Sequence, residues 1–372
     1  MKAGFYGVCG CQRLFQPGLK FKKEEIMKKW MVLMLAVGFV LTASFSAQAD
    51  SVLLPWVIKD KSISTIITLV NTADPAPQKV RFHLLYWYKA STKNEQTEKC
   101  EEVDFCVPTS YNDILVFDAA GNFNHGATLF GDTAVQGTKY TTVQGDALSL
   151  PVDGPRRAFL IVTNEIYTSE NCGAAPYMGE ENTIYAEAMV VDIANGAAWG
   201  YDGYNPQNAL SWMDFSDNGT DALGQVVASN NGEYAFLTIM PPSVFTTKIF
   251  VTPVDSNMWN GSLSVTSKLY CDIPGNLGGM YDYDERCVSF DTVKKVVCTD
   301  ASTVDHYVSS GAWTIFTNTK AEGWAYLYLP NVVGSTRQAT IGKLEYSLGT
   351  ASFDGNKIGA AINNFIWLRG RI

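Results

Sequence analysis

The chain has 372 residues, of which 47% are hydrophobic, with 28 Lys and Arg against 37 Asp and Glu. This apolar content is enough for a sizeable core and excludes global disorder. The net charge of −9 argues against a nucleic-acid partner, because an acidic surface repels a phosphate backbone.

Residues 27–49 are predicted to form a secretory signal peptide. Lys28 and Lys29 precede an apolar run, and small residues then end in Ala47-Gln48-Ala49, just before Asp50. A short positive segment, an apolar segment and a small-residue cleavage site are typical of such signals. The run is too short to cross a bilayer as a helix, so we expect no transmembrane segment after cleavage.

Residues 1–26 are interpreted as a mis-assigned start that is not translated in vivo, with Met27 as the initiator. The residues just before Met27 can be encoded by codons that contain a purine-rich ribosome-binding site, which indicates a bacterial gene. The alternative is a signal peptide with a long charged start. The mature chain, residues 50–372, carries 21 basic and 35 acidic residues, a net charge of −14. We expect it in the periplasm, at the cell surface or in the extracellular space.

The sequence of the mature chain predicts β-strands almost throughout. Apolar, β-branched and aromatic runs alternate with turns rich in Gly, Asn, Asp and Pro, the pattern expected of strands. The predicted strands are residues 62–71, 80–88, 114–117, 158–163, 183–192, 234–240, 248–252, 262–270, 293–298, 313–317, 324–329, 339–347 and 364–368. They predict an all-β, antiparallel β-sandwich architecture.

Two sandwich-like units, immunoglobulin-like or jelly-roll-like, are expected. Similar stretches recur in the two halves, notably residues 157–164 (RAFLIVTN) and 311–318 (GAWTIFTN). The alternative is convergent β patterning without duplication. We predict one unit over residues 50–232 and the second over residues 233–372.

Six cysteines remain in the mature chain, and an even number in an exported protein favours disulfides. Zinc spacing is absent, because no two of them lie two to four residues apart. Cys100 with Cys106 is the best single pairing from sequence, and at least one bridge is expected among the last three. The six are Cys100, Cys106, Cys172, Cys271, Cys287 and Cys298.

No catalytic signature is present. His83, His125 and His306 belong to no metal-ligand spacing, and no nucleophile elbow, phosphate-binding loop or dinucleotide fingerprint occurs. We therefore predict no catalytic residue, no cofactor and no enzyme activity.

One weak metal motif remains, a candidate calcium loop with oxygen side chains at alternate positions and Gly219 at the turn. Position twelve is Gln225, not the bidentate Glu, and a polar turn explains the same residues. The candidate ligands are Asp214, Ser216, Asn218 and Asp221. The acidic run 281–285 is a second such candidate.

A Gly-rich aromatic stretch at residues 199–206 is the candidate glycan contact. Sugars stack their apolar faces on rings while their hydroxyls meet carboxylates and amides. Loop aromatics also pack over the ends of sandwiches, which is the alternative interpretation. The residues are Trp199, Tyr201, Asp202 and Tyr204.

The sequence therefore predicts an exported, disulfide-bonded bacterial binding or structural protein, with a protein partner, self-assembly or a glycan as its interaction. Residues 51–58, apolar and just after the cleavage point, are a candidate exchanged strand. The alternative is a secreted carbohydrate-active enzyme or glycan-binding protein that uses loop aromatics and carboxylates.

Overall fold

The fold was analysed in a computed structural model. The chain separates into residues 1–45 and a second unit, residues 46–372, and only the second contains described residues. The described residues are 51–72, 80–89, 100–123, 128–131, 148–150, 155–166, 183–194, 197–204, 215, 227–229, 234–243, 245–255, 257–258, 263–272, 277–319, 322–330, 338–347, 352–353, 356–357 and 362–367.

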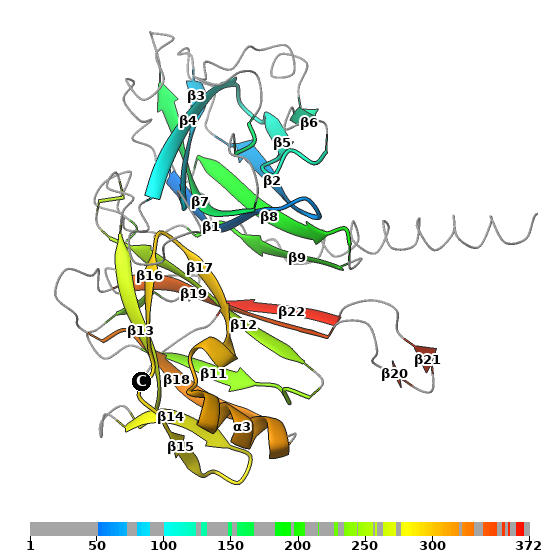
Figure 1. The fold of residues 1–372 in the computed structure, drawn as a ribbon. Helices are drawn as coiled ribbons and strands as arrows, with labels where there is room; N and C mark the ends of the chain where they lie inside the picture. The colour runs from blue at the N-terminus through cyan, green and yellow to red at the C-terminus, as the bar shows by residue number, and fades with distance from the viewer. Residues whose placement is uncertain are drawn as a thin grey trace, which may run out of the picture. The chain divides into compact units, whose positions relative to one another are not determined.

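Strands from the first part of the mature chain form two antiparallel sheets (Figure 1). One has the order β1-β7-β3-β4, with β1 Ser51–Lys59, β7 Arg156–Ile166, β3 Val80–Lys89 and β4 Cys100–Thr109. The other has the order β6-β5-β2-β8-β9, with β6 Thr128–Gly131, β5 Ile114–Asp118, β2 Ile63–Asn71, β8 Ile184–Asp192 and β9 Ala197–Asp202.

These two sheets pack face to face around one hydrophobic core. Alternate residues of β3, among them Phe82, Leu84 and Tyr86, point into it and meet Ile67 and Leu69 of β2. Side chains of a strand alternate between its two faces, so this period of two is what places one face of each sheet inside.

Strands from the second part form two further antiparallel sheets. One has the order β10-β19-β12-β17, with β22 also paired to β19; the strands are β10 Val227–Ser229, β19 Gln338–Ser347, β12 Thr246–Val254, β17 Asp300–Thr303 and β22 Ile362–Trp367. The other has the order β11-β18-β13-β14-β15, with β16 paired to β13; the strands are β11 Ala235–Ile239, β18 Gly323–Tyr328, β13 Ser264–Asp272, β14 Leu277–Asp282, β15 Cys287–Ser289 and β16 Val293–Val297. A separate hairpin pairs β20 Ser352–Phe353 with β21 Asn356–Lys357.

A second core lies between these sheets. Leu237 and Leu327 from one sheet meet Val251 and Ile341 from the other. A 3-10 turn, η3 Val304–His306, and a helix, α3 Ser310–Thr319, contribute to the same core (Figure 1). The predicted all-β antiparallel fold is therefore confirmed, while the predicted division at residues 232 and 233 stays a prediction.

One predicted strand is wrong, because residues 313–317 lie within helix α3. Ala312 and Phe316 are buried and four residues apart, which puts both on one helical face against the core. The Trp313 amide donates to the Ser309 carbonyl, as a helical turn requires. The resemblance of this stretch to residues 157–164, which form β7, is therefore one of composition only.

The outer face of the β1-β7-β3-β4 sheet is covered by the chain's own later residues. Leu85, Trp87 and Phe159 lie on this face and pack with Tyr204 and Phe215 in a third buried cluster. Met258, Val254 and Cys298 complete it. Strands β3 and β7 are therefore buried on both faces, which explains why they are apolar along nearly their whole length.

Strand β1 belongs to the interior of its own chain. Ser51 to Val57 are buried, and β1 pairs with β7 in an antiparallel register that shifts between Leu54 and Val57. Pro55 lies at the shift, because a proline has no N–H for the ladder. The Pro55 carbonyl instead accepts hydrogen bonds from the Thr252 and Thr299 hydroxyls, at 2.8 and 3.2 Å. Deleting residues 51–58, the candidate exchanged strand, would remove part of this core.

Candidate functional site

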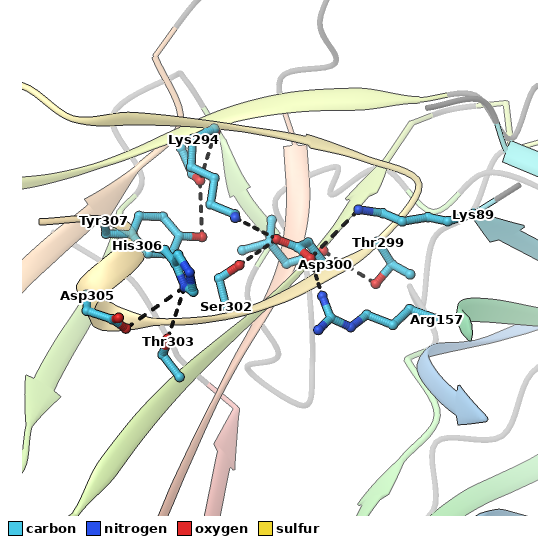
Figure 2. Close-up of polar contacts among 12 residues, drawn as sticks. Lys89, Arg157, Lys294, Thr299, Asp300, Ser302, Thr303, Asp305, His306 and Tyr307 are labelled. Atoms are coloured by element: carbon cyan, nitrogen blue, oxygen red, sulfur yellow. Dashed lines mark hydrogen bonds and ion pairs between the residues drawn. The ribbon is translucent and has the colours of Figure 1, made fainter. Parts of the chain in front are cut away.

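The most concentrated charge cluster of the described residues surrounds Asp300 at the start of β17 (Figure 2). Its carboxylate lies 2.5 Å from the Arg157 guanidinium, 3.0 Å from the Lys294 ammonium and 3.7 Å from the Lys89 ammonium. The Ser302 hydroxyl donates to the same carboxylate at 2.6 Å. Lys89 and Arg157 come from β3 and β7, so the cluster joins the first pair of sheets to the second.

Asp300 is held ionised by these neighbours. Burial by itself raises the pKa of Asp300, but the charges of Lys89 and Lys294, the Ser302 hydroxyl and the Arg157 charge outweigh burial and hold it well below its usual range. The Thr252 and Thr299 bonds to Pro55 lie at the same junction, and Trp56 packs against Phe250 with ring centroids 5.2 Å apart. We interpret this cluster as a structural connection between the sheets.

A second buried network lies on the outer face of β3. Arg81 donates to Glu165 at 2.9 Å, and the two ring nitrogens of His83 lie 2.7 Å from Glu165 and 3.3 Å from Asp104. Burial lowers the pKa of His83, but hydrogen bonds to the two carboxylates and their charges outweigh it and raise the pKa to about 9. His83 is therefore a protonated, internally paired side chain at neutral pH.

The predicted glycan residues are brought together by β9 and the turn after it, but mostly inside the protein. Tyr201 is buried, and its hydroxyl donates to the Trp56 carbonyl at 2.6 Å. Tyr204 is buried in the third cluster, and Trp199 packs on Phe250. These rings fill the interior, as the alternative interpretation of loop aromatics expects.

Among the predicted glycan residues, Asp202 lies beside a second carboxylate. It pairs across strands with Glu187, whose carboxylate accepts a hydrogen bond from the Tyr185 hydroxyl at 2.8 Å. Burial, and then the charge of Glu187, raises the pKa of Asp202 to about 6.

The predicted calcium ligands Asp214, Ser216, Asn218 and Asp221 lie outside the described residues. In the second acidic candidate, the Asp282 carboxylate accepts the backbone N–H groups of Asp284 and Arg286 at 2.9 Å each, so it shapes the turn between β14 and β15. In the described part of the chain, no three His, Cys, Asp or Glu side chains gather as a metal site requires.

The disulfides differ from the pairing predicted for Cys100. Cys100 is bonded to Cys298, and Cys271 to Cys287, while Cys106 is disulfide-bonded too and Cys172 lies outside the described residues. The Cys100–Cys106 prediction is wrong because both residues lie on β4. Six residues of extended strand span about 20 Å, and a disulfide needs α-carbons within about 7 Å. The expected bridge among the last three cysteines is confirmed.

The outer face of the β11-β18-β13-β14 sheet carries a set of aromatic side chains that sequence reasoning missed. Their aliphatic neighbours on β11 and β18, such as Leu237 and Leu327, point into the core, so the rings point the other way. We call this set the aromatic face. Its members are Tyr234, Phe236, Tyr270, Tyr281, Trp324, Tyr326 and Tyr328, of which Tyr270 is buried beneath its neighbours at 7% exposure.

The rings of the aromatic face contact one another both across and along the strands. Tyr281 stacks on Trp324 with centroids 4.2 Å apart, and Trp324 meets Tyr326 edge-on at 5.4 Å. Tyr234 and Phe236 lie 4.7 and 6.1 Å from Tyr326. Phe236 is 46% exposed, so this part of the sheet meets solvent. The feature that could have revealed the face is the alternation of large rings with Ala and Leu in both strands.

Polar groups border the aromatic face. Lys268 lies over the Tyr270 ring, 4.9 Å from its centroid, and is ion-paired with Asp291. Thr238 is exposed and sits opposite Trp324 in the strand register. The face therefore combines ring surfaces with hydroxyl, indole and charged groups, which together can bind an amphipathic ligand.

No family model, curated protein or solved structure matches this chain. Within the described residues, none of the helices has the length and apolar character needed to span a bilayer.

Proposed function

We propose that this protein is an exported bacterial binding protein and that the aromatic face is its glycan-binding surface. The observation that carries the proposal is the cluster of rings on the solvent side of one sheet. Large contiguous ring surfaces left in contact with water are uncommon on proteins that bind nothing.

Export is supported by two independent features. Residues 27–49 have the composition of a signal peptide. Cys100–Cys298 and Cys271–Cys287 are disulfides, which form and persist in oxidising compartments such as the periplasm or the medium. Both features favour a mature protein that works outside the cytoplasm.

Binding through the aromatic face is favoured over assembly through strand edges. The outer edge of β4 carries Glu101 and Glu102, both exposed, together with Asp104 and Pro108. Charged residues and proline on an edge strand are the usual protection against pairing with another chain. This edge is therefore poorly suited to building filaments.

The proposal is tested by affinity electrophoresis of residues 50–372 in gels that contain a panel of plant, fungal and bacterial polysaccharides. We expect retardation by at least one glycan and its loss in a Trp324→Ala/Tyr326→Ala variant. Tyr111→Ala is the matched control, because Tyr111 is an aromatic residue that is 48% exposed in another part of the chain.

Two outcomes would contradict the proposal. One is that no glycan in the panel retards the protein. The other is that light scattering finds an oligomer that the Trp324→Ala/Tyr326→Ala variant cannot form, since the face would then be an interface between copies of the chain.

A further inference from the structure

Resting on the proposed function, we infer that the ligand of the aromatic face is an uncharged, β-linked polysaccharide, bound as a single extended chain. Four properties of the face favour this class of ligand, namely its shape, the tilt of its rings, its hydrogen-bonding groups and its charge.

The shape of the face favours an extended ligand. Its rings come from neighbouring strands at alternate positions, so their α-carbons lie about 4.8 Å apart across strands and about 7 Å apart along them. Small molecules bind in concave pockets that bury most of their surface. The open side of a sheet instead suits a polymer that touches several rings at once, and β-linked chains are extended with flat sugar faces.

The tilt of the rings favours a single chain over a crystalline surface. Tyr281 and Trp324 are nearly parallel, at 24°, but Trp324 and Tyr326 meet at 86° and Tyr234 and Tyr326 at 71°. A flat crystal face could lie against only a few of these rings together. A separate chain can twist from one sugar to the next and follow them.

The polar atoms of the face match sugar hydroxyls. Apart from the buried Tyr270, four of the rings are tyrosines and one is a tryptophan, so five carry a hydroxyl or an indole N–H beside their apolar surface. Such rings can pack on the C–H groups of a sugar while their polar atoms form hydrogen bonds with its hydroxyls.

The charge around the face disfavours an anionic polysaccharide. Lys268 and Arg286, the basic groups near the rings, are ion-paired with Asp291 and Asp284. Two acidic residues near the rings are exposed, Glu322, which lies two residues before Trp324, and Asp272. One further basic residue, Lys295, is exposed as well. Because acidic residues outnumber basic ones here and in the mature chain as a whole, carboxylated chains are repelled.

The test compares two soluble polymers with the same β-linked glucose backbone, uncharged hydroxyethylcellulose and anionic carboxymethylcellulose, at low salt. We expect hydroxyethylcellulose to retard residues 50–372 in affinity gels and carboxymethylcellulose to bind roughly tenfold more weakly. Crystalline cellulose should deplete little protein from solution. Trp324→Ala should weaken binding to hydroxyethylcellulose at least roughly tenfold. Tyr326→Phe, which keeps the ring, should weaken it less, and Tyr111→Ala should leave it unchanged.

The outcomes separate this inference from the proposed function. Equal or tighter binding of carboxymethylcellulose, lost in Trp324→Ala, would overturn the uncharged ligand and leave the glycan-binding face standing. Depletion by crystalline cellulose that depends on Trp324 would overturn the single-chain mode. Binding of α-linked polymers alone would overturn the β-linked class, and no retardation by any glycan would overturn the proposed function itself.

Discussion

Two sheets carry aromatic residues on their outer faces, but one of these faces is covered by other parts of the chain and the other is open to solvent. On β3 and β7, Trp87 and Phe159 point away from the first core but are buried again by Tyr204, Phe215 and Met258. On β11 and β18, Phe236 and its neighbours also point away from a core, yet Phe236 stays 46% exposed. Aromatic residues on the outside of a sheet therefore stabilise the fold only where later parts of the chain return to cover them.

A disulfide and two ion pairs hold the covering residues against the outer face of β3 and β7. Cys100 on β4 is bonded to Cys298, which belongs to the buried cluster, and Asp300 two residues later is paired with Lys89 and Arg157. No comparable covering segment packs on the aromatic face among the described residues. The covered face therefore contributes to stability, whereas the open face is the surface proposed above to bind a ligand.

The largest effect is expected from removing the disulfide that closes the covered face. Cys100–Cys298 spans 198 residues and Cys271–Cys287 spans 16. On the loop-entropy model these bridges contribute about 5 and about 3 kcal/mol. A Cys100→Ser/Cys298→Ser variant should therefore lose more free energy of unfolding in urea than Cys271→Ser/Cys287→Ser. The reverse order would show that the long bridge does not hold the cover in place.

The two faces are compared directly by matched phenylalanine substitutions. Phe159→Ala, at a fully buried position, should lower the free energy of unfolding by about 4 kcal/mol because it leaves a cavity. Phe236→Ala should change it by about 0.5 kcal/mol or less, as substitutions at exposed positions do. Urea unfolding measures both. A large loss in Phe236→Ala would mean that the aromatic face is part of the folded core.

Removal of the Asp300 charge should destabilise the junction beside the covered face. Asp300→Asn leaves Lys89, Arg157 and Lys294 without their shared anion, at a cost of about 3 kcal/mol. Because the folded pKa of Asp300 is depressed, its contribution is present above about pH 4 and is lost as the pH falls further. Asp305→Asn, at an exposed carboxyl, is the control that should keep both stability and acid sensitivity.

Because of His83, the free energy of unfolding should decrease as the pH rises above neutral. The pKa of His83 is raised from 6.5 to about 9 in the folded protein, so its stabilisation is fully present below pH 6.5 and is lost as the pH rises through 9. The free energy of unfolding should fall by up to about 1.4 kcal/mol per pH unit in this window. His83→Gln should flatten the slope, whereas the exposed His306→Gln should retain it. An unchanged slope in His83→Gln would contradict the protonated assignment.

The period-two pattern predicted most of the long strands, because an apolar strand reveals itself without knowledge of its partners. It missed β4, whose Glu101, Glu102 and Asp104 interrupt the pattern at an edge. It placed a strand in α3, because Trp313 and Ile315 are typical of strands while the helix is fixed by packing of Ala312 and Phe316. Tertiary context overrides propensity in such short segments.

The site was less predictable than the fold. Alternation shows that a strand has two kinds of face but does not say which one lies inside. In β18 the aliphatic Ala325 and Leu327 fill the core and Trp324 and Tyr326 face out, although large rings are common core residues. The Cys100–Cys298 bridge was hidden for a related reason, because a pairing across 198 residues depends on how the sheets meet.

The most direct test of the account is hydroxyl-radical footprinting of residues 50–372 with and without hydroxyethylcellulose. Bound polymer is expected to lower the oxidation of Phe236, Trp324 and Tyr326, while Tyr111 is oxidised as before. Unchanged oxidation of these three rings, or protection confined to other parts of the chain, would contradict the assignment of the aromatic face as the binding surface.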